Sequence, residues 1–253
     1  MRLAIASIGE LPSLSLTEVD NSWTTTRRYD TKFVLERTML DLFFRDSSIS
    51  YSALEVNDAR AFTYRTTYFD TPDLLLYRDH AQRRRRRVKV RTRQYIESDR
   101  VRLEVKAKLG NGQTQKTFFE NVNGIEPSDF EIVNGAIHDI HSSKRFNHLA
   151  ENLLPTAVNT FQRSTLINQG AVERITLDSG LILETDTKSI SMNRELVLVE
   201  IKSPQRMSQT VRQLRQSGIH PTSFSKYCAA IELTQDLRPR VHDAEKLHRA
   251  FDI

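Results

Sequence analysis

The sequence predicts an α+β fold in which a closed antiparallel β-barrel carries its helices on the outside. Seven segments alternate apolar with polar or charged residues, which is the pattern of strands with one wet face. Several of these strands place Arg and Lys on one face and Val, Leu or Ile on the other. Other segments carry apolar residues at helical spacing, and no break in composition divides the chain. Together these observations favour one mainly antiparallel domain with helices packed around it.

Composition limits the class of protein. The chain has 253 residues, a formal net charge of +5 and one cysteine, Cys228, which excludes an internal disulfide and disfavours a cysteine-based zinc site. No stretch approaches the roughly 20 apolar residues of a membrane helix. We therefore expect a cytoplasmic protein that does not itself span a membrane, with a membrane-bound partner left open. We divide it into a lead-in (1–26), a main domain (27–234) and a helical tail (235–253).

The elements follow in chain order from residue period and turn chemistry. Residues 32–46 predict a short amphipathic helix, because apolar side chains recur there at helical spacing. Gly110-Asn111-Gly112 and Asp178-Ser179-Gly180 each predict a tight hairpin between two strands. The predicted strands are 62–70, 87–95, 101–108, 115–121, 172–178, 181–186 and 195–202.

Two further helices are predicted later in the chain. Residues 143–154 predict a helix that turns Phe146, Leu149 and Leu153 inward and ends at Pro155. Ser203-Pro204 predicts the start of another, because a cap residue followed by proline is typical of a helix N-terminus, and Gly218 predicts its end.

Positive charge is concentrated in one part of the chain. Residues 78–108 hold thirteen basic and four acidic residues, so this segment carries +9 and the remainder −4. A field concentrated in this way indicates a polyanionic ligand.

Alternation gathers the charged residues of each strand on one face, because residues two apart point the same way. For any one strand, the solvated side of an open sheet is the alternative interpretation. Two Glu-x-Lys pairs on these faces, and helices available to cover the apolar faces, favour an inward charged face. A lumen of like charges needs counter-charges, so we expect a water-filled tunnel that binds an anion and a divalent metal. The faces are Arg87/Lys89/Arg91/Arg93, Arg102/Glu104/Lys106/Lys108, Arg174/Thr176/Asp178 and Glu200/Lys202.

Seven segments in this order resemble the VTC domain. This is the polyphosphate polymerase domain of the vacuolar transporter chaperone complex, a branch of the triphosphate tunnel metalloenzyme (CYTH-like) superfamily. The resemblance spans about residues 27–233 and implies a triphosphate tunnel fold. It also implies transfer of the γ-phosphoryl group of ATP to a growing inorganic polyphosphate chain, with Mn²⁺ or Mg²⁺. The segments are RRYDTKFVL (27–35), TTYFDTPDLLLY (66–77), RVKVRTRQY (87–95), LEVKAK (103–108), ERITLD (173–178), LVEIK (198–202) and SFSKY (223–227).

The resemblance assigns roles residue by residue. It implies that the metal is held by Glu200. The implied catalytic residues are Lys32, Arg91, Arg93, Arg163, Arg174 and Lys226. The implied phosphate-binding residues are Lys106, Lys116, Lys202 and Ser225.

One motif departs from the wider superfamily. Its triphosphatases open with Glu-x-Glu-x-Lys, whereas Arg28-x-Asp30-x-Lys32 has that spacing here. The loss of a carboxylate favours the VTC branch over a two-metal hydrolase and leaves the metal coordination open. Phosphoryl transfer depends mainly on positioning and charge neutralisation, so no covalent nucleophile is expected.

Several residues have a second interpretation. The run 83–87 is either a solvated rim at the tunnel mouth or a direct contact with the phosphate chain. Glu104 is either an ion-pair partner or a metal ligand. His138 and His141 are interpreted as exposed loop residues, and Cys228 as a buried small residue.

Three other functions stay as alternatives to the polymerase, whose expected partners are ATP and polyphosphate. An inorganic triphosphatase shares the fold and uses water as the acceptor. A polyphosphate or nucleotide sensor binds without turnover. Nucleic-acid binding is disfavoured, because aromatic residues suited to base stacking are not expected on the 87–93 face. The sequence does not predict an oligomeric state.

Overall fold

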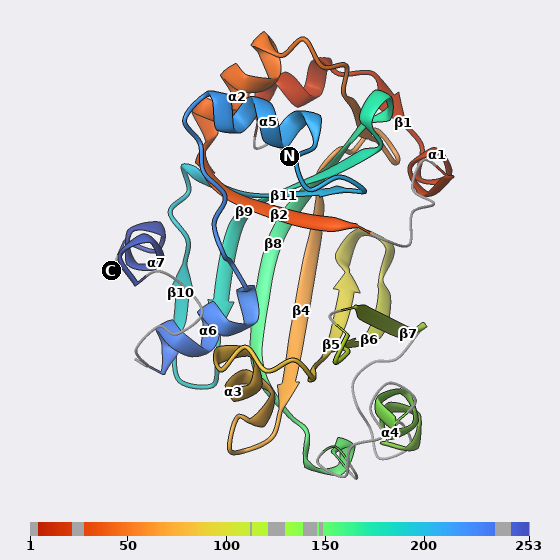
Figure 1. The fold of residues 1–253 in the computed structure, drawn as a ribbon, viewed down its shortest axis with the longest axis vertical. Coiled ribbons are helices and arrows are strands. Elements are labelled where there is room, and N and C mark those ends of the chain that lie inside the picture. The colour runs from red at the N-terminus through yellow and green to blue at the C-terminus, as the bar shows by residue number, and fades with distance from the viewer. Residues whose placement is uncertain are drawn as a thin grey trace.

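A computed structural model describes residues 5–21, 28–111, 113–120, 130–138, 146, 149–235 and 244–252. Its strands form one sheet whose main path runs β2-β11-β9-β8-β4-β5-β6-β7, with antiparallel neighbours throughout (Figure 1). The short β1 pairs with β3 in parallel, and β3 and β10 pair with β8 and β9. The strands are β1 (Ser13–Leu14), β2 (Tyr29–Glu36), β3 (Ser52–Leu54), β4 (Phe62–Asp70), β5 (Arg87–Tyr95), β6 (Arg100–Lys108), β7 (Thr114–Glu120), β8 (Leu154–Asn168), β9 (Glu173–Glu184), β10 (Ser189–Ser191) and β11 (Leu196–Ser203).

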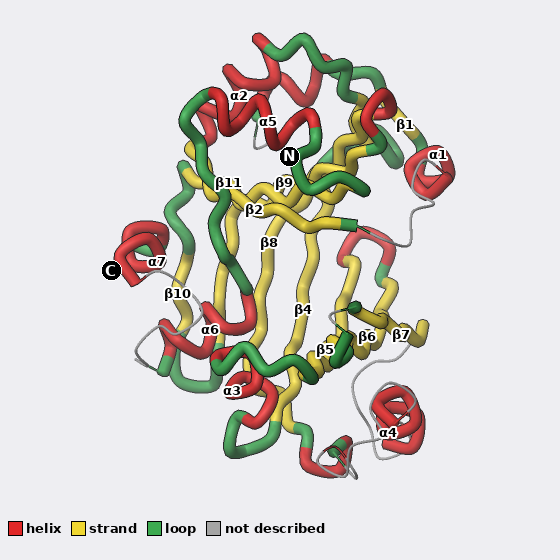
Figure 2. The backbone as a smooth tube through the Cα atoms, viewed as in Figure 1, coloured by secondary structure: helices red, strands yellow, loops and turns green. Residues whose placement is uncertain are grey.

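The helices lie around this sheet (Figure 2). In the view of Figure 1, α2 and α5 lie above β2 and β11, while α3 and α6 lie near the lower ends of the long strands. The helices are α1 (Leu16–Asn21), α2 (Arg37–Asp46), α3 (Leu75–Ala81), α4 (Phe130–His138), α5 (Gln209–Gln216), α6 (Lys226–Thr234) and α7 (Ala244–Ala250). Each of these helices is too short to span a bilayer, within the part of the chain that the structure describes.

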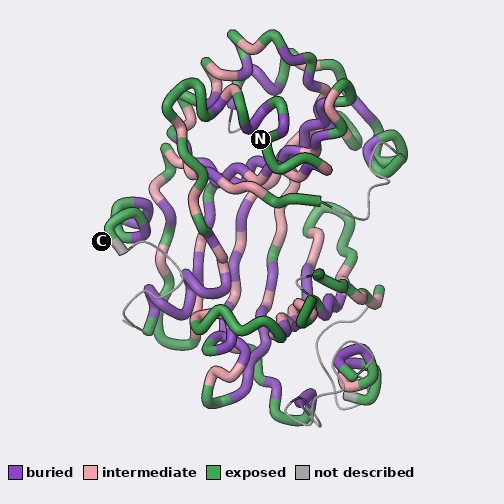
Figure 3. Tube along the Cα trace, in the orientation of Figure 1, coloured by how far each residue is buried: buried purple, intermediate pink, exposed green. Residues whose placement is uncertain are grey.

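The outer face of the sheet is apolar and covered by helices. Val88 and Val90 of β5 and Val105 of β6 pack with residues of α3 and α4 in one cluster. Phe33 of β2 and Val199 of β11 belong to a second cluster with residues of α2 and α5. Buried backbone accordingly follows the strands and the inner sides of these helices in Figure 3. The predicted separation of apolar outer and charged inner faces is therefore confirmed.

The opposite, inner face changes character along the strands. At one end it carries the charged residues, whereas at the other it is apolar and packs against α6. Phe161, Leu181 and Leu198 of the sheet join Tyr227 and Ile231 of α6 in a third buried cluster. Helix α6, which is buried from Tyr227 to Thr234, thus covers one end of the inner face and leaves the charged end to form a site.

The sheet is strongly curved around this inner face. Lys32 of β2 donates through Nζ to the carbonyl oxygen of Phe224 at 2.7 Å, and Lys89 of β5 donates to Ser225 Oγ at 2.9 Å. Their strands lie five places apart along the sheet, which in a flat sheet is about 24 Å. Contact with consecutive residues requires the sheet to bend into a trough. The predicted closure of the barrel is not seen, since no hydrogen-bonded ladder joins β2 to β7 within the described residues.

The predicted helix over 143–154 is wrong at its C-terminal end. Only Ala150–Asn152 form a 3-10 turn, and Leu154 and Pro155 begin the 15-residue strand β8. Residues 143–145 lie outside the described part of the chain. Phe146, Leu149 and Leu153 are nevertheless buried, as expected. The sequence prediction missed β8 because its apolar residues were attributed to helical spacing.

The predicted hairpin at Asp178-Ser179-Gly180 is also wrong. β9 runs through these residues without turning back. Its register with β8 shifts between Thr160 and Gln162, and Gly180 has a φ of 60°, which marks a bulge. The extra residue moves Leu181 onto the face that Asp178 occupies, so one strand serves both the charged and the apolar ends of the inner face.

Two helix starts lie later than predicted. Residues 32–36 belong to β2, so the first helix begins at Arg37. β11 extends to Ser203, and α5 begins at Gln209 rather than at the Ser203-Pro204 pair. The end predicted at Gly218 is confirmed by its φ of 78°. The hairpin at Gly110 and Asn111 is confirmed by the pairing of β6 with β7.

Candidate functional site

Side chains from seven strands and α6 gather at the charged end of the trough. The register places the strand residues on one face, because each of them pairs across the sheet with another member of the set, and Lys226 of α6 reaches the same face. Basic residues outnumber acidic ones. The basic members are Lys32, Lys89, Arg91, Arg93, Arg102, Lys106, Lys116, Arg163, Arg174, Lys202 and Lys226, and the acidic members are Asp30, Glu104, Glu120, Asp178 and Glu200. All eleven of these cations and Glu200, with Ser225, were predicted as site residues or as members of a charged face, and the structure brings them together.

Glu104 is the first of three carboxylates that each hold two cations. Its Oε2 accepts from Arg91 Nε at 2.8 Å, and its Oε1 accepts from Lys116 Nζ at 3.0 Å. Only 2% of the side chain is exposed. Burial alone raises the pKa of Glu104, but Arg91, Arg93 and Lys116 outweigh burial and hold that pKa well below its ordinary value. With both oxygens occupied, Glu104 is an ion-pair partner in this structure.

Asp178 is the second carboxylate. It accepts two parallel bonds from Arg163, from Nε at 2.6 Å and from the terminal nitrogen at 2.8 Å, and a further bond from Lys226. Burial raises its pKa, but Arg163 and Lys226 lower it to about 2. Burial also lowers the pKa of Lys226 to about 8, in spite of Asp178. The guanidinium of Arg163 lies over the rings of Tyr64 and Phe161, which fixes its position.

Glu200 is the third carboxylate. Its Oε2 accepts from Lys202 Nζ at 2.7 Å, and its Oε1 lies 3.8 Å from Lys32 Nζ. Burial raises the pKa of Glu200, but Lys202 and Lys32 keep it well below the ordinary value, so the carboxylate is charged. Lys32 is opposite Glu200 in the ladder between β2 and β11.

Four cations of the set have no carboxylate within ion-pairing distance in the described part of the chain: Lys89, which donates to Ser225, and Arg93, Lys106 and Arg174. Arg93 contacts only Thr66 Oγ1, at 3.3 Å, and the ring of Tyr64. Burial lowers the pKa of Arg174, and it lowers the pKa of Lys106 to about 8. Arg93 is buried and Arg174 is half-buried, whereas Lys106 is exposed. A buried cation without a partner is costly, which favours an anionic ligand at this end of the trough.

Lys89 and Tyr68 belong to the site but were not assigned roles from the sequence. Lys89 was placed on the charged face, but its contact with Ser225 needs the fold. Tyr68 lies opposite Arg91 in the ladder and is buried. Burial raises its pKa, but Arg91 and Lys89 lower it to about 8. The sequence indicates Tyr68 only through strand alternation, which places it on the same face of β4 as Tyr64 and Thr66.

Ser225, predicted to bind phosphate, has protein partners. Its Oγ accepts from Lys89 and from the backbone N–H of Cys228 at 3.4 Å, so it caps α6. The predicted burial of Cys228 is confirmed.

The basic run 83–87 forms a rim. Residues 83–86 are exposed, whereas Arg87 begins β5 on the inner face. This exposure favours the interpretation of most of the run as a solvated rim, and its direct contact with a phosphate chain stays a prediction. His138 is exposed at the end of α4, and His141 lies outside the described residues.

Aromatic side chains lie on the inner face next to the 87–93 face, on which aromatic residues suited to base stacking were not expected. Tyr95 shares the face of Arg93 and contacts Tyr64, with ring centroids 5.1 Å apart. Tyr64 in turn stacks on Phe161 at 5.5 Å. These rings pack against one another and beneath Arg163 instead of standing free.

A divalent metal would find few protein ligands here. No group of three or more His, Cys, Asp or Glu side chains forms a metal cage among the described residues. Glu200 offers hard oxygen atoms, and Asp30 follows on the adjacent strand, opposite Lys202. Mg²⁺ and Mn²⁺ are commonly bound by one or two carboxylates together with substrate phosphates. The donors therefore fit a metal that arrives with a phosphate ligand.

Comparisons with known proteins complete the description. No curated protein matches the chain. Among solved structures, a putative adenylate cyclase from Bacillus halodurans is 11% identical with a TM-score of 0.47, over 79% of this chain and 94% of that one. A putative adenylyl cyclase from Hippeastrum, described as having a dominant triphosphatase activity, is 16% identical with a TM-score of 0.44, over 85% and 99%. A protein from Pyrococcus horikoshii is 11% identical with a TM-score of 0.43, over 83% and 99%.

One family matches most of the sequence. The VTC domain covers residues 27–235, which includes all the predicted site residues and ten of the eleven strands. The chain therefore belongs to the VTC domain family.

Proposed function

We propose that this protein is a polyphosphate polymerase that transfers the γ-phosphoryl group of ATP to a growing polyphosphate chain. The observation that carries the proposal is the gathering of cations from strands far apart in the sheet at one end of the trough, in a chain of the VTC family. A phosphate chain presents anionic oxygens along its whole length, which matches a line of cations better than a single pocket does.

We assign different roles to the cations that form ion pairs and to those that do not. Arg163 is locked by Asp178, and Arg91 by Glu104, so their guanidinium groups are positioned before a ligand arrives. Such fixed charges stabilise the charge on a transferring phosphoryl group without reorganising. Arg93, Lys106 and Arg174 have no carboxylate partner in the described part of the chain. We propose that they donate hydrogen bonds to phosphate oxygens of the ligand. We assign the phosphate-binding role to Lys202 and Lys116 as well.

The reaction needs no covalent intermediate on the protein. The terminal phosphate oxygen of the acceptor chain is already ionised, so it attacks the γ-phosphorus directly and ADP leaves. We propose that the tunnel closes around the chain, because the trough already brings β2 and β5 to adjacent residues. A metal held by Glu200, with Asp30 beside it, would neutralise charge on the phosphate oxygens.

The test is to incubate the purified chain with ATP and Mn²⁺, and in parallel with Mg²⁺, and to separate the products by size. Long phosphate chains together with ADP are expected. R163Q is expected to reduce the rate strongly, whereas R65Q, which removes an arginine of the outer face, is the matched control and is expected to leave it unchanged.

Other products would identify the alternatives. Orthophosphate released from tripolyphosphate, without any chain growth from ATP, would make the protein an inorganic triphosphatase. Tight tripolyphosphate binding without turnover in either metal would make it a sensor. Displacement of bound tripolyphosphate by single-stranded nucleic acid at equal ionic strength would show that the polyanion was misidentified.

A further inference from the structure

An exposed arginine rim, residues 83–86, precedes β5, and no step of the proposed reaction uses it. Arg84 Nε lies 3.2 Å from Asp79 Oδ1. The other three arginines have no carboxylate within ion-pairing distance in the described part of the chain. The Arg86 side chain lies beside the hairpin after β6, since a Cβ added at Gly110 would be 3.5 Å from Arg86 Nε. The rim therefore extends from the start of β5 to the end of β6.

Cations continue from the arginine rim along the inner face of β5 and β6. Arg87 lies opposite Lys108 in the ladder, and Lys89 lies opposite Lys106. Like charges that face each other in a ladder destabilise it. None of these four residues has a carboxylate within ion-pairing distance among the described residues, and the first carboxylate along this face of β6 is that of Glu104. The part of the trough next to the rim thus carries only positive charge on these two strands.

Two further observations indicate that this positive charge lacks a counter-charge. Arg87 Nε is buried and has no hydrogen-bond partner within the described part of the chain, which is costly for a buried N–H group. His80 on α3 has a pKa well below its ordinary value, first because of burial and then because of Lys89 and Arg87. Its imidazole is therefore neutral, and the positive field of β5 and β6 reaches α3. Both observations favour an anion at this position.

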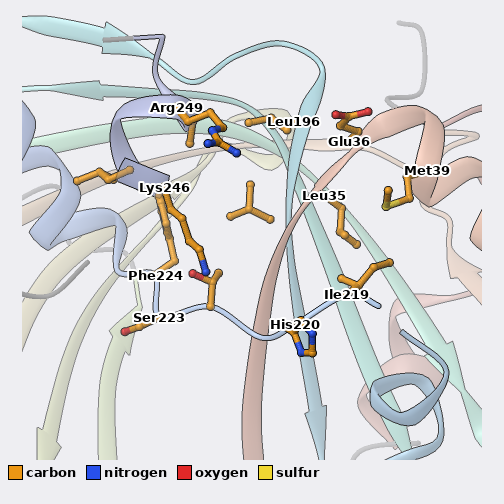
Figure 4. Close-up of a pocket in the computed structure, with 14 residues that line it drawn as sticks. Leu35, Glu36, Met39, Leu196, Ile219, His220, Ser223, Phe224, Lys246 and Arg249 are labelled. Atoms are coloured by element: carbon orange, nitrogen blue, oxygen red, sulfur yellow. The ribbon is translucent and has the colours of Figure 1, made fainter. Parts of the chain in front are cut away.

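The other way past α6, on the side of β2, is mainly apolar. Val34 lies two residues after Lys32 on β2 and therefore shares its face. Together with Leu196 and Phe224, it lines a pocket of about 420 Å³ between β2, residues 219–224 and α7 (Figure 4). None of the described cations of the phosphate site lines this pocket. A phosphate chain would lose hydration against apolar walls, so the cationic path over β5 and β6 suits it better.

We propose that the arginine rim is a second polyanion site, outside the trough, which binds the part of a long phosphate chain that leaves over the ends of β5 and β6. This inference rests on the proposed function, because it takes polyphosphate as the ligand. Arg87 lies four residues before Arg91 on β5, which is roughly 14 Å along the strand. Tripolyphosphate bound among the site cations would not extend to the rim, whereas a long chain would. Single-stranded nucleic acid is a poorer match, because residues 83–87 include no aromatic side chain for base stacking.

The test compares the binding of tripolyphosphate with that of long, size-fractionated polyphosphate, by isothermal titration calorimetry without ATP. The variant R85Q/R86Q is expected to weaken long-chain binding about fivefold to twentyfold. The slope of its logarithmic affinity against logarithmic salt concentration should become shallower by about one to two, because two phosphate contacts are lost. Tripolyphosphate affinity should stay within about twofold, since salt screens charges beyond roughly 8–10 Å.

Two other variants separate charge from structure. R45Q/R65Q removes two arginines from other surfaces and is the matched control, so it should bind both ligands as the unmodified chain does. R85K/R86K keeps both charges and should regain most of the long-chain affinity. Because Arg85 and Arg86 are exposed, R85Q/R86Q is expected to fold, and its thermal unfolding is the check.

Three results would overturn the inference. The first is an unchanged long-chain affinity and salt slope in R85Q/R86Q. The second is an equal loss of affinity for tripolyphosphate and for the long chain, which would assign these arginines to the site in the trough. The third is single-stranded DNA that binds as tightly as polyphosphate at equal ionic strength and loses as much affinity in the variant. Binding is measured without ATP, so a protein that makes no polyphosphate could still bind it at the rim, and the two failures are distinguishable.

A second arm uses the proposed reaction itself. With ATP and Mn²⁺, R85Q/R86Q is expected to make shorter chains than the unmodified protein at a similar initial rate, because the growing chain dissociates sooner. R45Q/R65Q should give the product lengths of the unmodified protein. An unchanged length distribution in R85Q/R86Q would exclude retention of the growing chain by the rim.

Discussion

At the scale of single residues, the site contains two kinds of cation. Some form ion pairs and stabilise the fold, whereas others have no carboxylate partner among the described residues and destabilise it. Arg163 and Arg91 satisfy buried carboxylates, so they belong to ion-paired networks. Arg93 is 9% exposed and has no carboxylate partner among the described residues, so its charge is buried without compensation. Substitutions of these arginines should therefore affect stability and binding differently.

For R93Q we expect weaker tripolyphosphate binding, by about tenfold to a hundredfold, because one charge-assisted hydrogen bond is lost. The free energy of unfolding should stay within about 1 kcal/mol of the unmodified chain or rise, because an unpaired buried charge is removed. R163Q should instead lower the free energy of unfolding by roughly 3 kcal/mol, because Asp178 loses its main partner. Urea unfolding and calorimetric titration measure both quantities. Equal destabilisation by the two variants would contradict the distinction.

Asp178 should make stability depend on acid pH. Its folded pKa of about 2 lies below the value of about 3.9 expected in the unfolded chain. The stabilisation from Asp178 is therefore fully present above about pH 4 and is lost as the pH falls toward 2. The shift corresponds to about 2 to 3 kcal/mol. Urea unfolding of D178N between pH 5 and 2 should show a loss of stability smaller by about this amount. Parallel curves for D178N and the unmodified chain would refute the assignment.

Much of the site at this scale could be predicted from the sequence, because alternate residues of a strand lie on the same face of the sheet. Alternation placed Arg91 beside Arg93 and Glu200 beside Lys202, and the ladders confirm both. Which cation meets which carboxylate was not accessible. The pairing of Arg163 with Asp178 depends on the register of β8 against β9, and β8 was itself not predicted.

At the scale of elements, the bulge in β9 determines how the site ends. An added Cβ at Gly180 would meet no atom within 4 Å, so only its backbone conformation restricts the residue there. G180A should lower the free energy of unfolding by about 1 kcal/mol, because the left-handed region disfavours alanine. G180N is the matched control and should cost less, since asparagine tolerates that region better. Thermal or urea unfolding is the measurement, and an equal cost for both variants would contradict a backbone origin.

Elements whose residue period was unambiguous were predicted well, and those that mix two environments were not. β4 and β5 match their predicted ranges, because one face of each is polar and the other apolar for most of its length. β9 was divided in two because its period shifts at the bulge, and Asp-Ser-Gly is also the composition of a turn. α6 was not predicted at all. It is buried on every side, so it lacks the one-sided apolar stripe that identifies a helix in sequence.

At the scale of the whole molecule, curvature decides whether separate strands make one site. Nothing local in the sequence specifies how far a sheet bends, so the charge pattern favoured an inward charged face and the resemblance implied a tunnel, but neither gave the curvature. The structure supplies the missing step through α6 and the segment before it, which hold Lys32 and Lys89 at consecutive residues. Because the cations then lie close together in one trough, the charge of the trough can be changed by pH and followed through ligand binding.

Lys106 provides that titration, because burial lowers its pKa to about 8. Bound phosphate oxygens should keep the ammonium group protonated, so tripolyphosphate affinity should fall as the pH rises from 7 to 9 and the free lysine loses its proton. The measurement is the tripolyphosphate affinity of the unmodified chain divided by that of K106Q at each pH. Ionisation of the ligand affects both affinities equally, so it cancels in this ratio. The ratio should fall by about tenfold between pH 7 and pH 9. The corresponding ratio for R93Q should stay constant, since an arginine remains charged at pH 9. A constant ratio for K106Q would show that Lys106 does not meet the phosphate chain.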